Sequence, residues 1–185
     1  MEISGEYQIA NDRKTVWAAL NDVDVLRKCI PGCESLEKIS DTQLNAMVTA
    51  SIGPVKAKFN TRISLQDLNP PESYTLVGES KSGVAGFGRG SAKVVLVKHD
   101  AGTILRYEAD FKVGGKLAQV GSRLVLGATR KMANDFFSTF AGVLDPAAVR
   151  LDLEMPTAAR STKSRTYVAV GIAGLVLLIW WFLLR

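Results

Sequence analysis

The feature that most constrains the fold is a series of segments between residues 43 and 113 in which apolar and polar residues alternate. In the clearest segment, Leu105 and Tyr107 alternate with Arg106 and Glu108. Successive side chains of a β-strand point to opposite faces, so this alternation predicts strands with one covered face and one wet face. Because the connections between the segments are short, the sequence predicts an antiparallel meander.

The segments on either side of this series complete the predicted architecture. Residues 2–10 alternate and predict a first strand, and two short helices capped by Asn11 or Asp12 and by Asp22 or Asp24 are expected to follow. Residues 116–144 carry an apolar residue every three or four positions, which predicts one amphipathic helix of about 43 Å. We therefore expect an α+β fold in which a curved antiparallel sheet wraps around a long C-terminal helix.

A second apolar segment lies near the C-terminus. Residues 167–184 contain no charge, and as a helix they would extend about 27 Å, close to the hydrocarbon thickness of a bilayer. Tyr167 at one boundary and Trp180 and Trp181 near the other are typical of membrane interfaces. The sequence predicts a transmembrane anchor here, since a helix that is apolar on all sides would need a larger shell than a small domain supplies. Small residues within it allow weak homodimerisation.

The charge distribution separates the predicted domain from its tail. Residues 1–145 carry 18 Lys/Arg and 16 Asp/Glu, which disfavours a nucleic-acid binder. Between the domain (residues 1–144) and the anchor, residues 145–166 are expected to form a flexible basic linker. Arg160, Lys163 and Arg165 in this linker predict that the domain stays on the cytoplasmic side and faces anionic lipid.

Few residues are arranged for catalysis or metal binding. The cysteines Cys29 and Cys33 have no nearby soft or imidazole ligands, so we expect a structural thiol pair, with redox switching as the alternative. The single histidine, His99, is expected at an exposed hairpin tip. Since the carboxylates fall at wet strand positions, turns and helix caps, the sequence suggests neither a catalytic residue nor a metal site.

The glycine-rich segment at residues 83–90 lacks the helix and the Lys-Ser/Thr of a phosphate-binding loop. A flexible hairpin is the plain interpretation. The alternative is a gate over a cavity or a partner-docking loop, with Phe87 and Arg89 as its exposed side chains.

The element order and four local motifs carry a family resemblance. The order is that of the helix-grip, or START-like (SRPBCC), fold. IPGCESLE at residues 30–37, GPVKAKF at 53–59, GFGRGSA at 86–92 and GGKLAQVGSRLV at 114–125 resemble the carbon monoxide dehydrogenase G-subunit family over residues 1–144. The resemblance implies association with a molybdenum-containing carbon monoxide dehydrogenase or a related hydroxylase at the bacterial inner (plasma) membrane.

The same resemblance implies an apolar cavity between the sheet and the long helix. The inward-facing positions mix small residues with aromatic ones, which permits such a space, although a filled core is the alternative. The predicted lining residues are Phe59, Leu96, Tyr107, Phe111, Leu124, Ala128, Met132 and Phe136. The expected ligand is a lipophile, with a quinone as the leading candidate, and no metal or covalent cofactor is expected.

These expectations give a membrane-anchored, non-catalytic accessory protein that binds a lipophile and links its dehydrogenase to the membrane. Two alternatives remain open at this stage: an enzyme of the same fold, such as a cyclase or aromatase, and an assembly factor for the dehydrogenase.

Overall fold

A computed structural model describes residues 1–145 of the chain. The predicted anchor (residues 167–184) and almost all of the predicted linker (145–166) lie outside the described residues, with Arg160, Lys163, Arg165, Tyr167, Trp180 and Trp181. None of the helices within residues 1–145 combines the length and the apolar character needed to cross a membrane.

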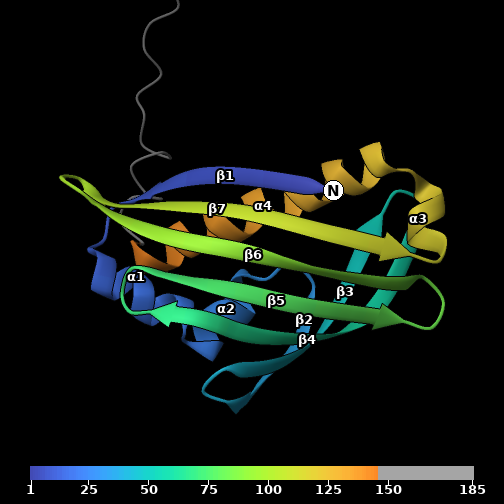
Figure 1. The fold of residues 1–185 in the computed structure, drawn as a ribbon, viewed down its shortest axis with the longest axis horizontal. Coiled ribbons are helices and arrows are strands. Elements are labelled where there is room, and N and C mark those ends of the chain that lie inside the picture. The colour runs from blue at the N-terminus through green and yellow to red at the C-terminus, as the bar shows by residue number, and fades with distance from the viewer. Residues whose placement is uncertain (146–185) are drawn as a thin grey trace, which may run out of the picture. The chain divides into compact units, whose positions relative to one another are not determined.

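The described part is built on one seven-stranded antiparallel sheet, as the alternation predicts (Figure 1). Its strand order is β1-β7-β6-β5-β4-β3-β2, so β2 to β7 form a meander and β1 pairs with the last strand. The strands are β1 (Glu2–Ile9), β2 (Cys33–Ser40), β3 (Gln43–Ile52), β4 (Val55–Asn69), β5 (Ser73–Ser82), β6 (Gly86–His99) and β7 (Gly102–Gly114).

Two short helices connect the edge strands, α1 (Arg13–Leu20) and α2 (Val23–Cys29). Each begins after an aspartate whose side chain accepts backbone hydrogen bonds, Asp12 for α1 and Asp22 for α2. Such caps satisfy backbone N–H groups that have no partner within the helix. The two capping predictions are thereby resolved to Asp12 and Asp22.

The predicted single helix over residues 116–144 is wrong in one respect. The structure divides it into α3 (Lys116–Val120) and α4 (Ser122–Leu144), with Gly121 between them. Gly121 has a φ of +93°, a conformation that favours glycine and interrupts the helix. The remaining 23 residues of α4 extend about 35 Å rather than 43 Å.

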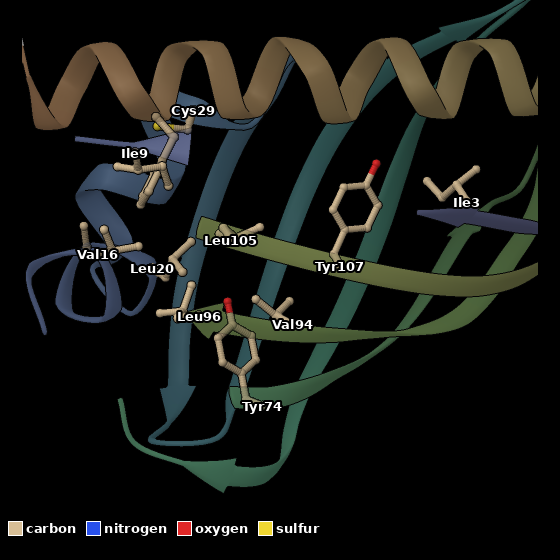
Figure 2. Close-up of a cluster of buried hydrophobic side chains, with 12 residues drawn as sticks. Ile3, Ile9, Val16, Leu20, Cys29, Tyr74, Val94, Leu96, Leu105 and Tyr107 are labelled. Atoms are coloured by element: carbon tan, nitrogen blue, oxygen red, sulfur yellow. The ribbon is translucent and has the colours of Figure 1, made fainter. Parts of the chain in front are cut away.

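Helix α4 lies behind the sheet and runs along its strands (Figure 1). The buried residues form three clusters. The main cluster joins α1, the C-terminal part of α4 and strands β1, β5, β6 and β7 (Figure 2). A second cluster joins α3 to β4 and to the hairpin before β6, and a third joins α2 to β2 and β3. Several residues of the main cluster also line a cavity between the sheet and α4.

Candidate ligand-binding cavity

A cavity of about 350 Å³ lies between the inner face of the sheet and α4. Its wall takes residues from all seven strands and from α1, α2 and α4, and most of them are aliphatic or aromatic. Ligand sites typically occupy about 300–1,000 Å³ and are lined in this way by apolar side chains with few polar groups.

Aromatic rings form one part of the wall. Tyr107 of β7 and Phe137 of α4 are stacked with ring centroids 5.7 Å apart, and Phe136 packs edge-on against Phe137 at 5.0 Å. Tyr74 of β5 also lines the cavity, and Trp17 of α1 packs edge-on against its ring at 5.4 Å. These rings present flat, polarisable surfaces to the cavity.

Small residues also form part of the wall and make room in the cavity. Ala92 of β6 and Ala109 of β7 are directly paired across the two strands, and both line the cavity. Paired positions on one face of an antiparallel sheet have their Cβ atoms about 5 Å apart. Two neighbouring methyl groups therefore leave space that larger side chains would fill.

The polar part of the wall lies at its rim, which we define as Asn21, Lys38, Ser40 and Asp41. Lys38 Nζ lies 2.8 Å from Asp41 Oδ1, and the two side chains are 48% and 98% exposed. Its hydrogen bond with Lys38 lowers the pKa of the Asp41 carboxyl. The ionisable groups of the rim are thus in water, not buried within the cavity.

A groove of about 360 Å³ adjoins the cavity on the same face of the sheet and shares Ala92 and Ala109 with it. Two of its lining residues, Gly78 and Gly88, have no neighbour that would meet an added Cβ closer than 3.9 Å and no positive φ. Neither backbone conformation nor packing requires glycine there. The effect of these glycines is to keep the groove wide.

Two tyrosines of the main cluster have hydroxyls with a raised pKa. The Tyr7 hydroxyl donates to Asn134 Oδ1 at 2.5 Å, and burial together with the nearby Tyr107 hydroxyl raises the pKa of Tyr7. Tyr74 is only 6% exposed, and burial alone raises the pKa of its phenol. Figure 2 shows the Tyr74 hydroxyl directed from β5 toward Val94 and Leu96.

The structure brings together only part of the predicted lining. Tyr107 and Phe136 line the cavity, and Phe111 lines the adjoining groove. Phe59 is buried in the second cluster, which joins α3 to β4. Leu96 is buried in the main cluster, which includes Val16 and Leu20 of α1.

The predicted helix residues Leu124, Ala128 and Met132 are not part of the cavity wall. Leu124 is 54% exposed. The predicted helix residues are spaced four apart, at positions 124, 128, 132 and 136. A helical turn takes 3.6 residues, so each of these positions is rotated by about 40° around the helix axis relative to the next, and the residues far from Phe136 no longer face the sheet. The wall instead uses Ala133, Phe136 and Phe137.

Several wall residues were missed by the sequence analysis. Leu20, Leu26 and Ile30 come from the two short helices, whose contacts with the sheet are distant in sequence. Tyr74 lies in the alternating segment at residues 73–80, so alternation together with the choice of its inner face could have identified it.

Phe87 and Arg89 are exposed, as expected. They alternate along β6 with Gly88 and Gly90 of the groove, which places their side chains on the opposite face of the sheet. The hairpin that precedes them is attached to α3, because Ala85 is fully buried and its carbonyl accepts a hydrogen bond from Leu117 N at 3.0 Å.

The two cysteines and the histidine do not line the cavity. Cys29 and Cys33 are free thiols, and burial raises the pKa of both. His99 is exposed at the end of β6, and its Nδ1 accepts a hydrogen bond from Ala101 N at 3.2 Å. Within residues 1–145, no three Asp, Glu, His or Cys side chains are grouped to hold a metal ion.

The sheet, the long helix and the apolar cavity between them define a helix-grip, START-like domain. Solved structures with this fold include an aromatase/cyclase, Zhui, from Streptomyces sp. R1128, with 13% identity and a TM-score of 0.62 over 80% of this chain and 95% of that chain. A protein of Thermus thermophilus gives 14% identity and a TM-score of 0.60 over 80% of this chain and 99% of that one. At these identities the likeness shows the fold alone.

The chain belongs to the carbon monoxide dehydrogenase G-subunit (CoxG) family, whose model matches residues 5–144. A conserved protein of Geobacillus kaustophilus is 31% identical to this chain, with a TM-score of 0.74 over 78% of this chain and 95% of its own. A comparison with curated proteins gives no match.

Proposed function

We propose that this chain is a non-catalytic accessory protein that binds a lipophilic ligand in the cavity between the sheet and α4. The observation that carries the proposal is the largely apolar wall around about 350 Å³, which combines aromatic rings with the small side chains of Ala92 and Ala109. Burial of an apolar ligand against such a wall is favoured by about 25 cal/mol for each Å² of apolar surface removed from water.

The ligand that we favour is a quinone. The rings of Tyr107, Phe136 and Phe137 suit contact with a flat ring, and the groove that adjoins the cavity has room for an attached chain. Membership of the CoxG family supports a molybdenum-containing carbon monoxide dehydrogenase, or a related hydroxylase, as the partner.

The apolar segment at residues 167–184 supports a role at the bacterial inner membrane. A quinone is insoluble in water, so a binding domain tethered beside the bilayer can exchange it without releasing it into solvent. In this role the chain links the dehydrogenase to the membrane and brings the ligand to the enzyme.

Binding is better supported than catalysis at this cavity. The charged groups on its wall, Lys38 and Asp41, are exposed at the rim and paired with each other. General acid–base catalysis needs an ionisable group within hydrogen-bond reach of the reacting atoms, usually with a shifted pKa. The cyclase or aromatase alternative would require such a group deeper in the cavity.

The ligand can be tested by extraction. The full chain is purified from its native membranes in mild detergent, extracted with organic solvent and analysed by mass spectrometry for bound lipophiles. We expect a quinone in stoichiometric amount with the parent chain. Ala92→Phe fills the cavity and should abolish recovery, whereas Ser91→Phe adds the same side chain on the opposite face of β6 and should not. Repeated absence of any lipophile from the parent chain would contradict the proposal.

The membrane link is tested separately by deleting residues 160–185. The family match and the described core lie within residues 1–145, so the shortened chain should remain folded. We expect the dehydrogenase to move from the membrane fraction to the soluble fraction. An assembly factor would instead be absent from the mature membrane-bound enzyme, so co-purification with that enzyme distinguishes the two roles.

A further inference from the structure

One polar group on the cavity wall is the hydroxyl of Tyr74. The residue is 6% exposed, and no group within residues 1–145 makes a hydrogen bond with this hydroxyl. A hydroxyl that loses water to an apolar ligand without gaining a hydrogen bond is unfavourable.

Several other hydroxyls on the inner side of this fold have partners within the chain. Thr103 is fully buried and its Oγ1 donates to the carbonyl of Asn11 at 2.8 Å. The Thr61 and Ser80 hydroxyls bond to each other at 2.8 Å, and the Tyr7 hydroxyl donates to Asn134. Most buried polar side-chain atoms in proteins are hydrogen-bonded, and the Tyr74 hydroxyl, on the cavity wall and not fully buried, is accessible to a partner from outside the chain.

The surroundings of Tyr74 determine which partner fits. Val94, Leu96 and Leu105 pack in the same buried cluster, and Trp17 contacts the Tyr74 ring edge-on. Burial raises the pKa of the phenol, so the group stays protonated and can donate a hydrogen bond at physiological pH. A neutral donor in apolar surroundings suits an uncharged acceptor such as a carbonyl oxygen.

We propose that the Tyr74 hydroxyl donates a hydrogen bond to an acceptor oxygen on the buried end of the bound lipophile. The cavity thereby selects oxygen-bearing lipophiles over hydrocarbons of the same shape. This inference rests on the proposed function, because it requires that the cavity accept a lipophile.

Two probes of matched shape separate the hydrogen bond from apolar contact. They are 2-methyl-1,4-naphthoquinone and 1,2,4-trimethylnaphthalene, in which methyl groups replace the two carbonyl oxygens. Each is titrated by calorimetry into the full chain in detergent, into Tyr74→Phe, and into Tyr7→Phe as the matched control, because Tyr7 does not line the cavity and its hydroxyl bonds to Asn134. Tyr74→Phe should weaken quinone binding roughly 5-fold, since a neutral hydrogen bond contributes about 1 kcal/mol.

The other affinities measured in these titrations should change little. We expect Tyr74→Phe to bind the hydrocarbon as well as the parent does, and Tyr7→Phe to retain the preference for the quinone. Equal affinity of Tyr74→Phe and the parent for the quinone would overturn the role of Tyr74 while leaving the cavity as a lipophile site. If the parent binds neither probe, both this inference and the proposed function fail.

A measurement on the parent chain alone keeps the test independent of how the variants fold. Infrared difference spectra of the bound naphthoquinone should show a carbonyl band shifted to lower frequency relative to the quinone in hydrocarbon solvent. An unshifted band would overturn the hydrogen bond. The thermal midpoint of Tyr74→Phe without ligand should equal or exceed that of the parent, because the substitution removes a hydroxyl that has no partner within the fold.

Discussion

The two ends of the space between the sheet and α4 are packed differently. At one end, which we call the filled end, Val16, Leu96 and Phe140 are each no more than 2% exposed and touch other core residues. Further along the same strands, in what we call the hollow middle, residues such as Ala109 line the cavity. The two regions share strands, a helix and the inward-facing side of one sheet.

The difference lies in the size of the inward-facing side chains. Along β6 these are Leu96, Val94 and Ala92 in turn, followed by two glycines at positions 90 and 88. Large aliphatic side chains fill the filled end and stabilise it, whereas the small ones leave room. The cavity thus results from the decrease in side-chain size along the inward-facing positions of the strands.

The largest expected effect is at the filled end. Phe140→Ala removes a fully buried ring, and we expect it to lower the free energy of unfolding by about 4 kcal/mol. Urea denaturation followed by circular dichroism measures this loss. Ser138→Ala on the exposed side of α4 is the control, with an expected change within about 0.5 kcal/mol. A loss below about 1.5 kcal/mol for Phe140→Ala would break the comparison.

The same truncation in the hollow middle should be less destabilising. Phe136 already borders the cavity on one side, so Phe136→Ala loses fewer contacts, and we expect a loss of about 2 kcal/mol. The same urea titration gives the value. Equal losses for Phe136→Ala and Phe140→Ala would mean that the middle is packed as tightly as the filled end.

Enlarging an alanine sharpens the comparison from the opposite direction. Ala19→Leu at the filled end should destabilise the fold by about 1–3 kcal/mol, because the surrounding core has no space for three more carbons. Ala109→Leu in the cavity should change the free energy of unfolding by less than about 1 kcal/mol. Both variants are compared by thermal unfolding, and a reversed order would contradict the account.

The groove predicts a smaller effect. Gly88→Val places its Cβ in ordinary van der Waals contact, 3.9 Å from the nearest atoms, and removes the strand penalty of glycine, so the free energy of unfolding should rise by about 0.5 kcal/mol. Binding should weaken for a naphthoquinone with a prenyl chain more than for 2-methyl-1,4-naphthoquinone. Competition titrations with the two quinones measure the ratio, and equal weakening of both would show that the chain does not lie along Gly88.

The smallest effect concerns the cap of α1, which covers the filled end. Hydrogen bonds from Thr15 and Lys14 lower the pKa of the Asp12 carboxyl below that of an unfolded chain, about 3.9. Its stabilisation is therefore present above about pH 4 and is lost as the pH falls through the folded pKa. Asp12→Asn should show a shallower decline of the thermal midpoint between pH 5 and pH 2.5. A decline identical to that of the parent would show that this cap does not contribute.

The sequence predicted the order of elements well, because alternation and helix caps are local signals. Asp12 and Asp22 were among the expected caps, and the strands follow the predicted segments. The break at Gly121 was missed, since an isolated glycine within a periodic segment does not by itself reveal a positive φ. Apolar periodicity alone does not show where a helix stops and restarts.

The cavity was predicted less fully than the fold. Tyr107 and Phe136 were placed on its wall, but Leu124 was assigned to a face that drifts away along the helix. Leu26 and Ile30 reach the cavity only because α2 packs against the sheet, which is a contact between distant parts of the chain. Alternation shows which face of a strand is covered, but it does not show where the side chains between the sheet and the helix leave a cavity.

The most direct test of the central claim is a crystal structure of the chain grown with 2-methyl-1,4-naphthoquinone. The account predicts electron density for one quinone between the aromatic wall and the paired alanines, with an oxygen within hydrogen-bond distance of Tyr74. A structure at saturating quinone in which Phe136 and Tyr107 close over Ala92 and Ala109, leaving no room for a ring, would contradict it.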